Sequence, residues 1–195
     1  MASTLDYYNK NAKAYALSTV ECKMDEAISI FLNEIKAPEA VILDFGCGSG
    51  RDSKVFLDKG YAVDSVDGSL EMCQEAEKFL SHPVTHMFFS DLSEVDSYDG
   101  IWACASILHL PYNKLRNVIL KMERALRKGG VVYASFRYGD MEGVRGERYF
   151  TDMNEEKLAS LLKDTRLDII KTWISNDVRL DRAGDKWFNI LLRKA

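Results

Sequence analysis

The stretch from Val41 to Gly50 constrains the fold of this chain more than any other. It reads Val-Ile-Leu-Asp-Phe-Gly-Cys-Gly-Ser-Gly, so a short apolar run stops at an acid and three glycines then stand at every second position. An apolar run of this length before a glycine turn predicts a buried parallel strand. Glycine lets the backbone bend sharply and approach a ligand closely, and the helix expected behind the turn directs its free N–H groups at the same point. The sequence therefore predicts a nucleotide-type pocket at the carboxyl end of a first strand.

The spacing of these glycines separates two classes of nucleotide-binding fold. A dinucleotide-binding turn follows the pattern G-x-G-x-x-G, which requires its third glycine at position 51. Arg51 occupies that position, and the third glycine, Gly50, comes one residue earlier. On this stretch alone, a purely structural strand-to-helix turn stays open as an alternative.

The composition predicts one soluble, cytoplasmic domain over residues 1–195. The N-terminus lacks the apolar segment of a signal peptide, and no apolar run approaches the roughly 18 residues of a membrane span. Four scattered cysteines indicate reduced thiols and no metal site. A net charge of −4 argues against wrapping nucleic acid. We expect helices in 1–37, a cofactor-binding core in 38–137 and a substrate-side loop, helix and hairpin in 138–195, in a monomer or a homodimer.

The pattern along the chain predicts alternating helices and strands. A first helix spans Ser3–Tyr15 with a cap at Ser3 or Thr4, and a second spans Glu21–Ile35 and ends before Pro38. After the first strand we expect a helix over 53–59 capped by Gly60, strands over 62–66, 84–89, 98–104 and 131–137, helices over 71–80 and 113–126, a loop over 138–150, a helix capped by Thr151 or Asp152 and ending near 163, and a closing hairpin of strands 167–175 and 186–193.

Asp67 is the first candidate for a ligand-binding side chain outside the glycine turn. It follows the second strand 17 residues after Gly50 and closes a strand–helix–strand unit. A carboxylate at this place accepts hydrogen bonds from both ribose hydroxyls of a nucleoside. The alternative is an ordinary turn acid or helix cap. Met72 comes early in the next helix, where its side chain can lie against a flat ring.

The pattern D-x-G-x-G-x-G from Asp44 to Gly50 resembles the first motif of the class I S-adenosylmethionine-dependent methyltransferases. Segments 43–53, 66–69, 98–111 and 129–133 carry the resemblance most specifically, and it covers nearly the whole chain. The chain is most similar to the small stand-alone bacterial methyltransferases called tellurite-resistance-like, as segments 148–151, 177–179 and 187–189 also indicate. The resemblance implies an α/β fold with a doubly wound, Rossmann-like seven-stranded sheet, strand order 3-2-1-4-5-7-6, strand 7 antiparallel and helices on both faces.

The resemblance also implies the cofactor, S-adenosyl-L-methionine, with S-adenosyl-L-homocysteine as product. In such enzymes an acid after the third strand takes the adenine amine and the next backbone N–H meets a ring nitrogen, which places Asp91 and Leu92 there. A leading helix often covers the cofactor, with an aromatic hydroxyl reaching its methionine end. The residues that we expect to bind cofactor are Tyr8, Asp44, Gly46, Cys47, Gly48, Gly50, Arg51, Asp67, Gly68, Ser69, Met72, Asp91, Leu92 and Cys104.

In this interpretation the acceptor is a small molecule whose nucleophilic atom attacks the methyl group in line with the carbon–sulfur bond that breaks. DNA amine methylases carry an Asn/Asp-Pro-Pro-aromatic turn after the fourth strand, and Cys104-Ala105-Ser106 stands there instead, which argues against a nucleic-acid acceptor. His109 is the candidate general base, because it lies just past the fourth strand. A packing or capping role for His109 stays equally open.

Arginines in the late loops supply a second indication about the acceptor. The guanidinium fork binds carboxylate and phosphate, so convergence of these loops over the pocket would select an anionic acceptor. Ion pairs of the arginines with Asp140, Glu142, Glu147 and Asp181 are the alternative. The loop arginines are Arg137, Arg145, Arg148, Arg179 and Arg182. The residues that we expect to bind the acceptor are Tyr7, Tyr15, Arg137, Tyr138, Arg148 and Arg179.

Two other functions share most of these sequence features. A nicotinamide-dependent oxidoreductase has the same strand–helix–strand unit and ribose acid, although Arg51 in place of a third glycine argues against it. A protein that binds S-adenosylmethionine or S-adenosylhomocysteine without turnover is the other alternative.

Overall fold

The computed structural model describes residues 4–37, 39–179, 182 and 184–195. The predicted cap Ser3, the break at Pro38 and the loop acid Asp181 lie outside these residues. In chain order the elements are α1 (Thr4–Thr19), α2 (Asp25–Asn33), β1 (Val41–Phe45), α3 (Arg51–Asp58), β2 (Ala62–Asp67), α4 (Leu70–Leu80), β3 (Val84–His86), η1 (Phe89–Asp91), β4 (Tyr98–Ala103), η2 (Ile107–His109), α5 (Tyr112–Ala125), β5 (Leu126–Arg137), β6 (Glu142–Arg145), β7 (Arg148–Thr151), α6 (Glu155–Leu162), β8 (Leu167–Asn176) and β9 (Lys186–Lys194).

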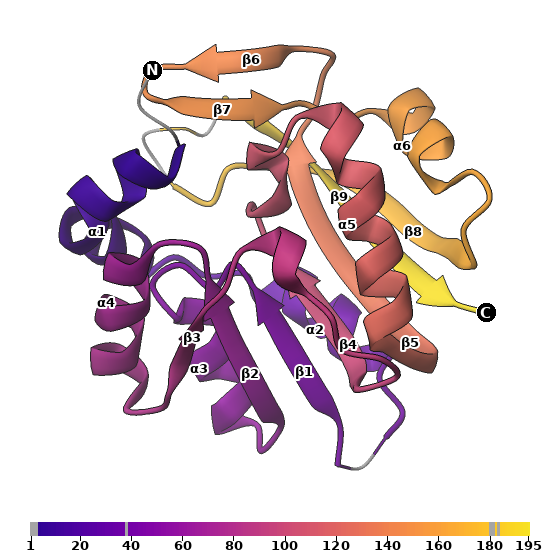
Figure 1. The fold of residues 1–195 in the computed structure, drawn as a ribbon, viewed down its shortest axis with the longest axis horizontal. Coiled ribbons are helices and arrows are strands. Elements are labelled where there is room, and N and C mark those ends of the chain that lie inside the picture. Colours follow the sequence, from indigo (N-terminus) through magenta and orange to yellow (C-terminus); the bar gives the residue numbers. More distant parts are fainter. Residues whose placement is uncertain (1–3, 38, 180–181, 183) are drawn as a thin grey trace.

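Seven strands form one sheet in the order β3-β2-β1-β4-β5-β9-β8 (Figure 1). The first five pair in parallel, and β9 runs antiparallel to both β5 and β8. This confirms the predicted doubly wound sheet, with β8 and β9 as its sixth and seventh strands. The sheet order reverses direction between β1 and β4, and a ligand crevice opens at such a point beyond the carboxyl ends of the strands.

Helices cover both faces of the sheet, and the strand sequences explain why. In β1, Ile42 packs with α2 and α3, whereas Leu43 and Phe45 pack on the opposite face with α5. In β5, Val131 and Tyr133 lie on the face that α2 and α3 cover, and Val132 lies on the face that α5 covers. Successive side chains of a strand point to opposite faces, so a strand that is buried on both sides must be apolar throughout.

The prediction of a loop over 138–150 is wrong in one respect, because much of this segment forms a β-hairpin. Strands β6 and β7 pair antiparallel, with Arg145 opposite Arg148 and a two-residue turn at Gly146 and Glu147. Gly146 has φ +62°, the left-handed conformation that tight hairpin turns require. Strands of four residues are too short to show a clear alternation of apolar and polar residues, so no periodic pattern indicated them.

Other boundaries differ from the prediction as well. Helix α2 begins at Asp25, four residues later than expected, and β5 begins at Leu126, five residues earlier than expected. The third strand is shorter, ends at His86 and leads into the short helix η1. Helix α6 begins two residues later than expected, because the side chain of Asn154, not Thr151 or Asp152, accepts the hydrogen bond from the Lys157 amide at 2.9 Å. Helix α1 continues to Thr19, one turn beyond the predicted end. This extra turn carries the helix across the crevice.

Candidate functional site: a covered crevice at the strand ends

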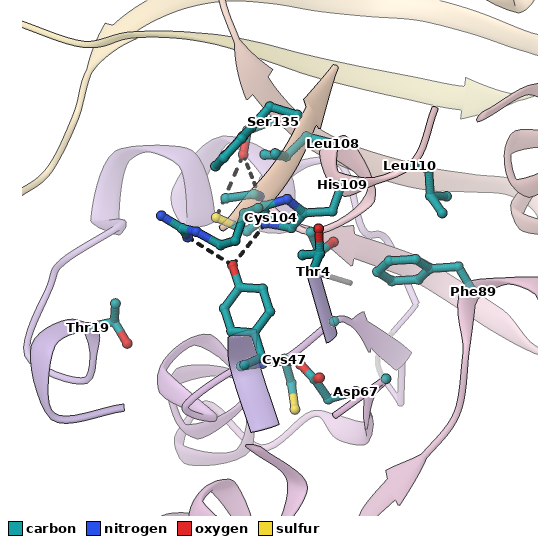
Figure 2. Close-up of a pocket in the computed structure, with 18 of the residues that line it drawn as sticks. Thr4, Thr19, Cys47, Asp67, Phe89, Cys104, Leu108, His109, Leu110 and Ser135 are labelled. Carbon is teal, nitrogen blue, oxygen red and sulfur yellow. Dashed lines mark hydrogen bonds between the residues drawn. The ribbon is translucent and has the colours of Figure 1, made fainter. Parts of the chain in front are cut away.

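A cavity of about 940 Å³ lies at the carboxyl ends of the central strands. Its floor is the glycine turn after β1 and the ends of β2, β4 and β5, and α1 and the β6–β7 hairpin roof it (Figures 1 and 2). Ligand pockets usually span about 300–1,000 Å³. The cavity is therefore large enough for a nucleoside cofactor together with a second small molecule.

The glycine turn forms the floor through its backbone. The amides of Gly46 and Cys47 both donate to the Val66 carbonyl at 2.9 Å, which ties the turn to β2. A Cβ atom on Gly46 would lie 2.4 Å from Cβ of Ser106, so packing requires glycine there. Gly48 has φ +56° and no neighbour within 4 Å of such a Cβ atom. Its backbone thus leaves open space in the cavity for a ligand.

Asp67 fastens the end of β2 to the glycine turn. Its Oδ2 accepts the Gly48 amide at 2.9 Å and its Oδ1 accepts the Ser69 amide at 2.8 Å. Burial raises the pKa of Asp67, although these two backbone hydrogen bonds act in the opposite direction. Each carboxylate oxygen has a second lone pair. The carboxylate, which lines the cavity, can therefore also accept hydrogen bonds from a ligand.

Arg51, the residue at the diagnostic third-glycine position, is folded into the cavity wall. Its Nε and Nη2 form a two-pronged ion pair with Asp52 at 2.7 and 2.8 Å. The indole of Trp102 donates to the same carboxylate at 2.8 Å. A dinucleotide turn needs close helix–strand contact at that position. The arginine side chain and its ion pair occupy this space here.

A chain of hydrogen bonds joins the roof of the cavity to His109. Arg148 donates to the Tyr8 hydroxyl at 3.2 Å, Tyr8 lies 2.9 Å from His109 Nε2, and His109 Nδ1 lies 2.6 Å from the Tyr149 carbonyl. His109 lines the cavity, as Figure 2 shows. A carbonyl only accepts, so Nδ1 carries the imidazole proton and Nε2 accepts from Tyr8. Burial lowers the pKa of His109 to about 4, and the charge of Arg148 acts in the same direction. His109 is therefore neutral at pH 7.

Helix α1 is fastened over the cavity at further points along its length. Thr4 Oγ1 accepts the Tyr149 amide at 2.9 Å, Asn9 Oδ1 accepts the Ser69 hydroxyl at 2.6 Å, and Thr19 Oγ1 donates to the Ser49 hydroxyl at 3.3 Å. These contacts reach the hairpin, α4 and the glycine turn. The helix is a cover that closes against three separate parts of the fold.

Three of the loop arginines pair with acids, whereas the neighbours of Arg148 are aromatic rings. Arg137 pairs with Asp185 at 2.5 Å, Arg145 forks onto Asp152, and Arg179 forks onto Asp177 at 2.9 and 2.6 Å. These three acids are not among the ion-pair partners that were considered from the sequence. Arg148 instead lies 4.8 Å from the Tyr7 ring and 5.2 Å from the Phe150 ring. Within the described residues no carboxylate pairs with Arg148.

The structure brings most of the predicted site residues to this one cavity. Those that line it are Tyr8, Tyr15, Asp44, Gly46, Cys47, Gly48, Arg51, Asp67, Gly68, Met72, Cys104, His109, Arg137, Arg148 and Arg179. The helix α1, the glycine turn, the β4–η2 segment and both arginine loops therefore contribute to a single site.

Six predicted residues do not line the cavity, and their surroundings explain why. Gly50 packs against Leu80, and Ser69 caps α4 while bonding to Asn9. Leu92 is buried in the core, whereas Asp91 is exposed and accepts from the neighbouring Ser90 hydroxyl. The set also contains two tyrosines. The ring of Tyr7 lies against the Arg148 guanidinium, and the Tyr138 hydroxyl points to Glu155 of α6.

Other residues line the cavity without having been predicted to do so. Phe88, Phe89 and Ser90 line the cavity where Asp91 was expected, and the two adjacent aromatic residues before the acid were the available signal. Trp187 and Asn189 also line the cavity. Both residues belong to segment 187–189, which contributed to the family resemblance but for which no ligand-binding role was predicted. Thr4 and Thr19 gave no signal, because their place depends on how α1 docks.

Comparison with known proteins agrees with this geometry. The model of a family described as "Methyltransferase domain" matches residues 42–130. A solved structure with a TM-score of 0.76 is the 1,6-didemethyltoxoflavin-N1-methyltransferase of Burkholderia thailandensis, with 1,6-didemethyltoxoflavin and S-adenosylhomocysteine bound; it is 21% identical, over 97% of this chain and 84% of that one. The chain has the class I methyltransferase fold. The family model is that of a methyltransferase domain, and two solved structures with this fold hold S-adenosylhomocysteine or S-adenosylmethionine.

Two further proteins with this likeness are named methyltransferases. The malonyl-[acyl-carrier protein] O-methyltransferase of Salmonella typhimurium is 27% identical over 156 residues, which are 76% of this chain and 59% of that protein. The magnesium protoporphyrin IX methyltransferase of Synechocystis, with S-adenosylmethionine bound, has a TM-score of 0.71 at 15% identity and covers 97% of this chain and 94% of that one. The chain spans little more than half of the curated relative. The expected tellurite-resistance-like subgroup is not confirmed and stays a prediction.

Two negative findings apply to the part of the chain that the structure describes. No helix there has the length and apolarity that a bilayer span requires. Nor do three or more histidine, cysteine or acidic side chains gather there as metal ligands.

Proposed function

We propose that this methyltransferase transfers the methyl group of S-adenosylmethionine to a small anionic acceptor, by attack of an acceptor oxygen. The observation that carries the proposal is the single cavity. It joins a nucleoside-type half, built from the glycine turn and Asp67, to a half that holds Arg148, Tyr8 and His109. Methyl transfer needs both molecules in one space from which water is excluded.

The cofactor half fits S-adenosylmethionine in its donor and acceptor groups. Gly48 leaves space at the backbone, Asp67 offers carboxylate oxygens for ribose hydroxyls, and Met72 and Phe89 offer apolar surface for the adenine ring. The bound cofactor supplies an activated methyl group on its sulfonium. The contribution of the chain is then to bind, to orient and to exclude water.

The acceptor half favours a nucleophile that is already ionised. A histidine with a pKa near 4 is a weak base at pH 7, and Tyr8 already occupies its free nitrogen. Such a group removes a proton from an alcohol inefficiently. A carboxylate needs no base. We therefore assign Tyr8 and His109 to orienting the acceptor, which replaces the predicted role of His109 as a general base.

Arg148 is the residue that we assign to recognising the anion. Its guanidinium lines the cavity, donates to Tyr8 and has aromatic neighbours in place of a carboxylate. A partly buried cation without an ionic partner gains strongly from an incoming anion. The curated relative supports an acidic acceptor, because its name specifies O-methylation of a malonyl group.

Transfer of labelled methyl from S-adenosylmethionine to a panel of small carboxylic acids and their matched amides tests this proposal. We expect methyl esters of the acids and no product from the amides. Arg148→Lys keeps the charge but loses the planar fork, so it should bind S-adenosylmethionine normally and lose turnover. The matched control is Arg145→Lys on the same hairpin, since Arg145 does not line the cavity. Equal methylation of the amides, or full turnover by Arg148→Lys, would contradict the anionic acceptor.

A further inference from the structure

A second, smaller pocket lies along helix α1, beside the main cavity. Its volume is about 170 Å³, against about 940 Å³ for the main cavity. Four residues of α1 line it, at successive spacings of four, three and four positions: Tyr7, Asn11, Ala14 and Ser18. Such spacings place side chains on one face of a helix. We call this space the outer pocket.

Three arginines supply positive charge to the outer pocket. Arg148 comes from β7, and Arg179 and Arg182 come from the turn between β8 and β9. The fork of Arg179 onto Asp177 holds that side chain in place, and the Arg148 guanidinium lies 4.8 Å from the centre of the Tyr7 ring. Among the described residues, no acidic side chain lines the outer pocket. Its lining therefore favours an anion.

The outer pocket and the main cavity share part of their lining. Tyr15, Arg148, Arg179 and Arg182 line both spaces. On α1, Tyr8 and Tyr15 stand one position after Tyr7 and Ala14, so the face toward the main cavity adjoins the face toward the outer pocket. A molecule bound in the main cavity can therefore extend past Arg148 into the outer pocket.

The size and the donors of the outer pocket indicate what it can hold. Pockets for a whole small molecule usually span about 300–1,000 Å³. A space of about 170 Å³ instead suits one polar group of a larger molecule. Guanidinium forks match the oxygens of a phosphate. Asn11 Nδ2 gives one hydrogen to the Tyr7 carbonyl at 2.8 Å and has a second one to donate.

We propose that the outer pocket binds a phosphate group of the acceptor, so that the acceptor is a phosphorylated carboxylic acid whose carboxylate lies in the main cavity. The inference rests on the proposed function and adds a second point of recognition to it. The reaction is unchanged: a carboxylate oxygen forms the bond to the methyl carbon as the carbon–sulfur bond breaks, and the phosphate does not react. Binding of this remote group orients the reacting one.

Paired acceptors test for the phosphate group. Phosphonoalkanoic acids of increasing chain length are compared with straight-chain monocarboxylic acids of the same lengths, because a phosphonate has the tetrahedral oxygens and the double charge of a phosphate ester. We expect kcat/KM for labelled methyl transfer to be at least about tenfold higher for the phosphono acid, at the chain length that spans the two spaces. Inorganic phosphate should compete with the phosphono acid and not with the monocarboxylic acid.

Changes at Ala14, an exposed position of the outer pocket, test where the phosphonate binds. Ala14→Glu adds a carboxylate there, and Ala14→Gln is the uncharged control of nearly equal size; glutamate and glutamine both favour helix. We expect Ala14→Glu to lose the preference for the phosphono acid and Ala14→Gln to retain it. Lys13→Gln, an equal change of net charge at an exposed position that lines neither space, should also retain it. The ratio of the two acceptors is the readout, because it cancels any general effect on turnover.

The outcomes separate this inference from the proposed function. Equal kcat/KM for both series at every chain length, or a preference unchanged in Ala14→Glu, would overturn the inference and leave the proposed function standing. A free ion as occupant would also overturn it: inorganic phosphate would then raise the melting temperature of Ala14→Gln more than that of Ala14→Glu, while both acceptor series react alike. Absence of methyl transfer to acids of either series would overturn both.

Discussion

At the scale of single residues, Asp67 combines a structural and a proposed ligand-binding role. A ligand-binding role alone predicts that replacing Asp67 weakens cofactor binding without changing stability. The two backbone amides that it accepts, from Gly48 and Ser69, change that expectation. Loss of the carboxylate leaves both amides without their partner inside the fold.

We therefore predict that Asp67→Ala lowers both cofactor affinity and the free energy of unfolding, the latter by about 1–3 kcal/mol for buried groups left unpaired. Urea unfolding and calorimetric titration with S-adenosylmethionine measure the two effects. Asp58→Ala, which loses only an exposed ion pair with Lys54, should change neither by much. An unchanged unfolding free energy for Asp67→Ala would show that these hydrogen bonds contribute little.

His109 gives a prediction about acid pH. Its folded pKa, about 4, lies below the ordinary value of 6.5, so its neutral form is favoured in the folded state. The stability that it contributes is present above pH 6.5 and is lost as the pH falls toward 4. His109→Asn can still donate to the Tyr149 carbonyl but does not titrate, so its unfolding free energy should decline less between pH 7 and pH 5. Parallel declines in urea unfolding would contradict the buried neutral imidazole.

At the scale of elements, helix α1 and the β6–β7 hairpin act together as the roof of the site. Arg148 and Tyr149 of β7 bond to Tyr8 and Thr4 of α1, and Asn9 fastens the same helix to α4. A cofactor under this roof leaves only when the roof opens. The lifetime of the complex should then depend on contacts that do not touch the cofactor.

Asn9→Ala tests this dependence, because it removes the acceptor for the Ser69 hydroxyl at the α1–α4 contact. One hydrogen bond contributes about 0.5–1.5 kcal/mol, so we expect the dissociation rate of S-adenosylmethionine to rise roughly two- to tenfold. Lys13→Ala, an exposed change on the same helix, should leave the rate unchanged. Stopped-flow displacement measures the rate, and equal rates for both variants would mean that α1 does not limit release.

At the scale of the whole molecule, the class of cofactor is the main prediction. S-adenosylmethionine and S-adenosylhomocysteine should stabilise the folded chain by mass action. At a hundred times the dissociation constant this amounts to about 2.7 kcal/mol, or roughly 5–10 °C in melting temperature for a chain of this size. NAD should give no shift, since Arg51 stands at the position of the third glycine. A shift with NAD alone would favour the oxidoreductase alternative. Binding of S-adenosylmethionine without turnover on any acceptor would favour the alternative of a non-catalytic binding protein.

The sequence by itself determined the central strands of the sheet and the floor of the site, whereas the strand order was implied by the resemblance to a known family. Apolar strands that are buried on both faces, the glycine turn and the acid at the end of β2 are local patterns, and a short stretch of chain is enough to specify each. Asp44, Gly46, Gly48 and Asp67 were therefore placed correctly on the cavity. The predicted role of Asp91 was not supported, because the exact exit of the chain from β3 depends on how η1 packs.

Only the tertiary structure decided the acceptor side of the site. Tyr8 meets His109 across 101 positions and Arg148 across 140, and no local pattern encodes a contact between segments so far apart. The same applies to the partners of the arginines: Arg137, Arg145 and Arg179 face acids, and Arg148 faces rings, because the hairpin and the last turn fold back over α1. The burial that makes His109 neutral likewise exists only once these layers close, since desolvation is a property of the packed molecule.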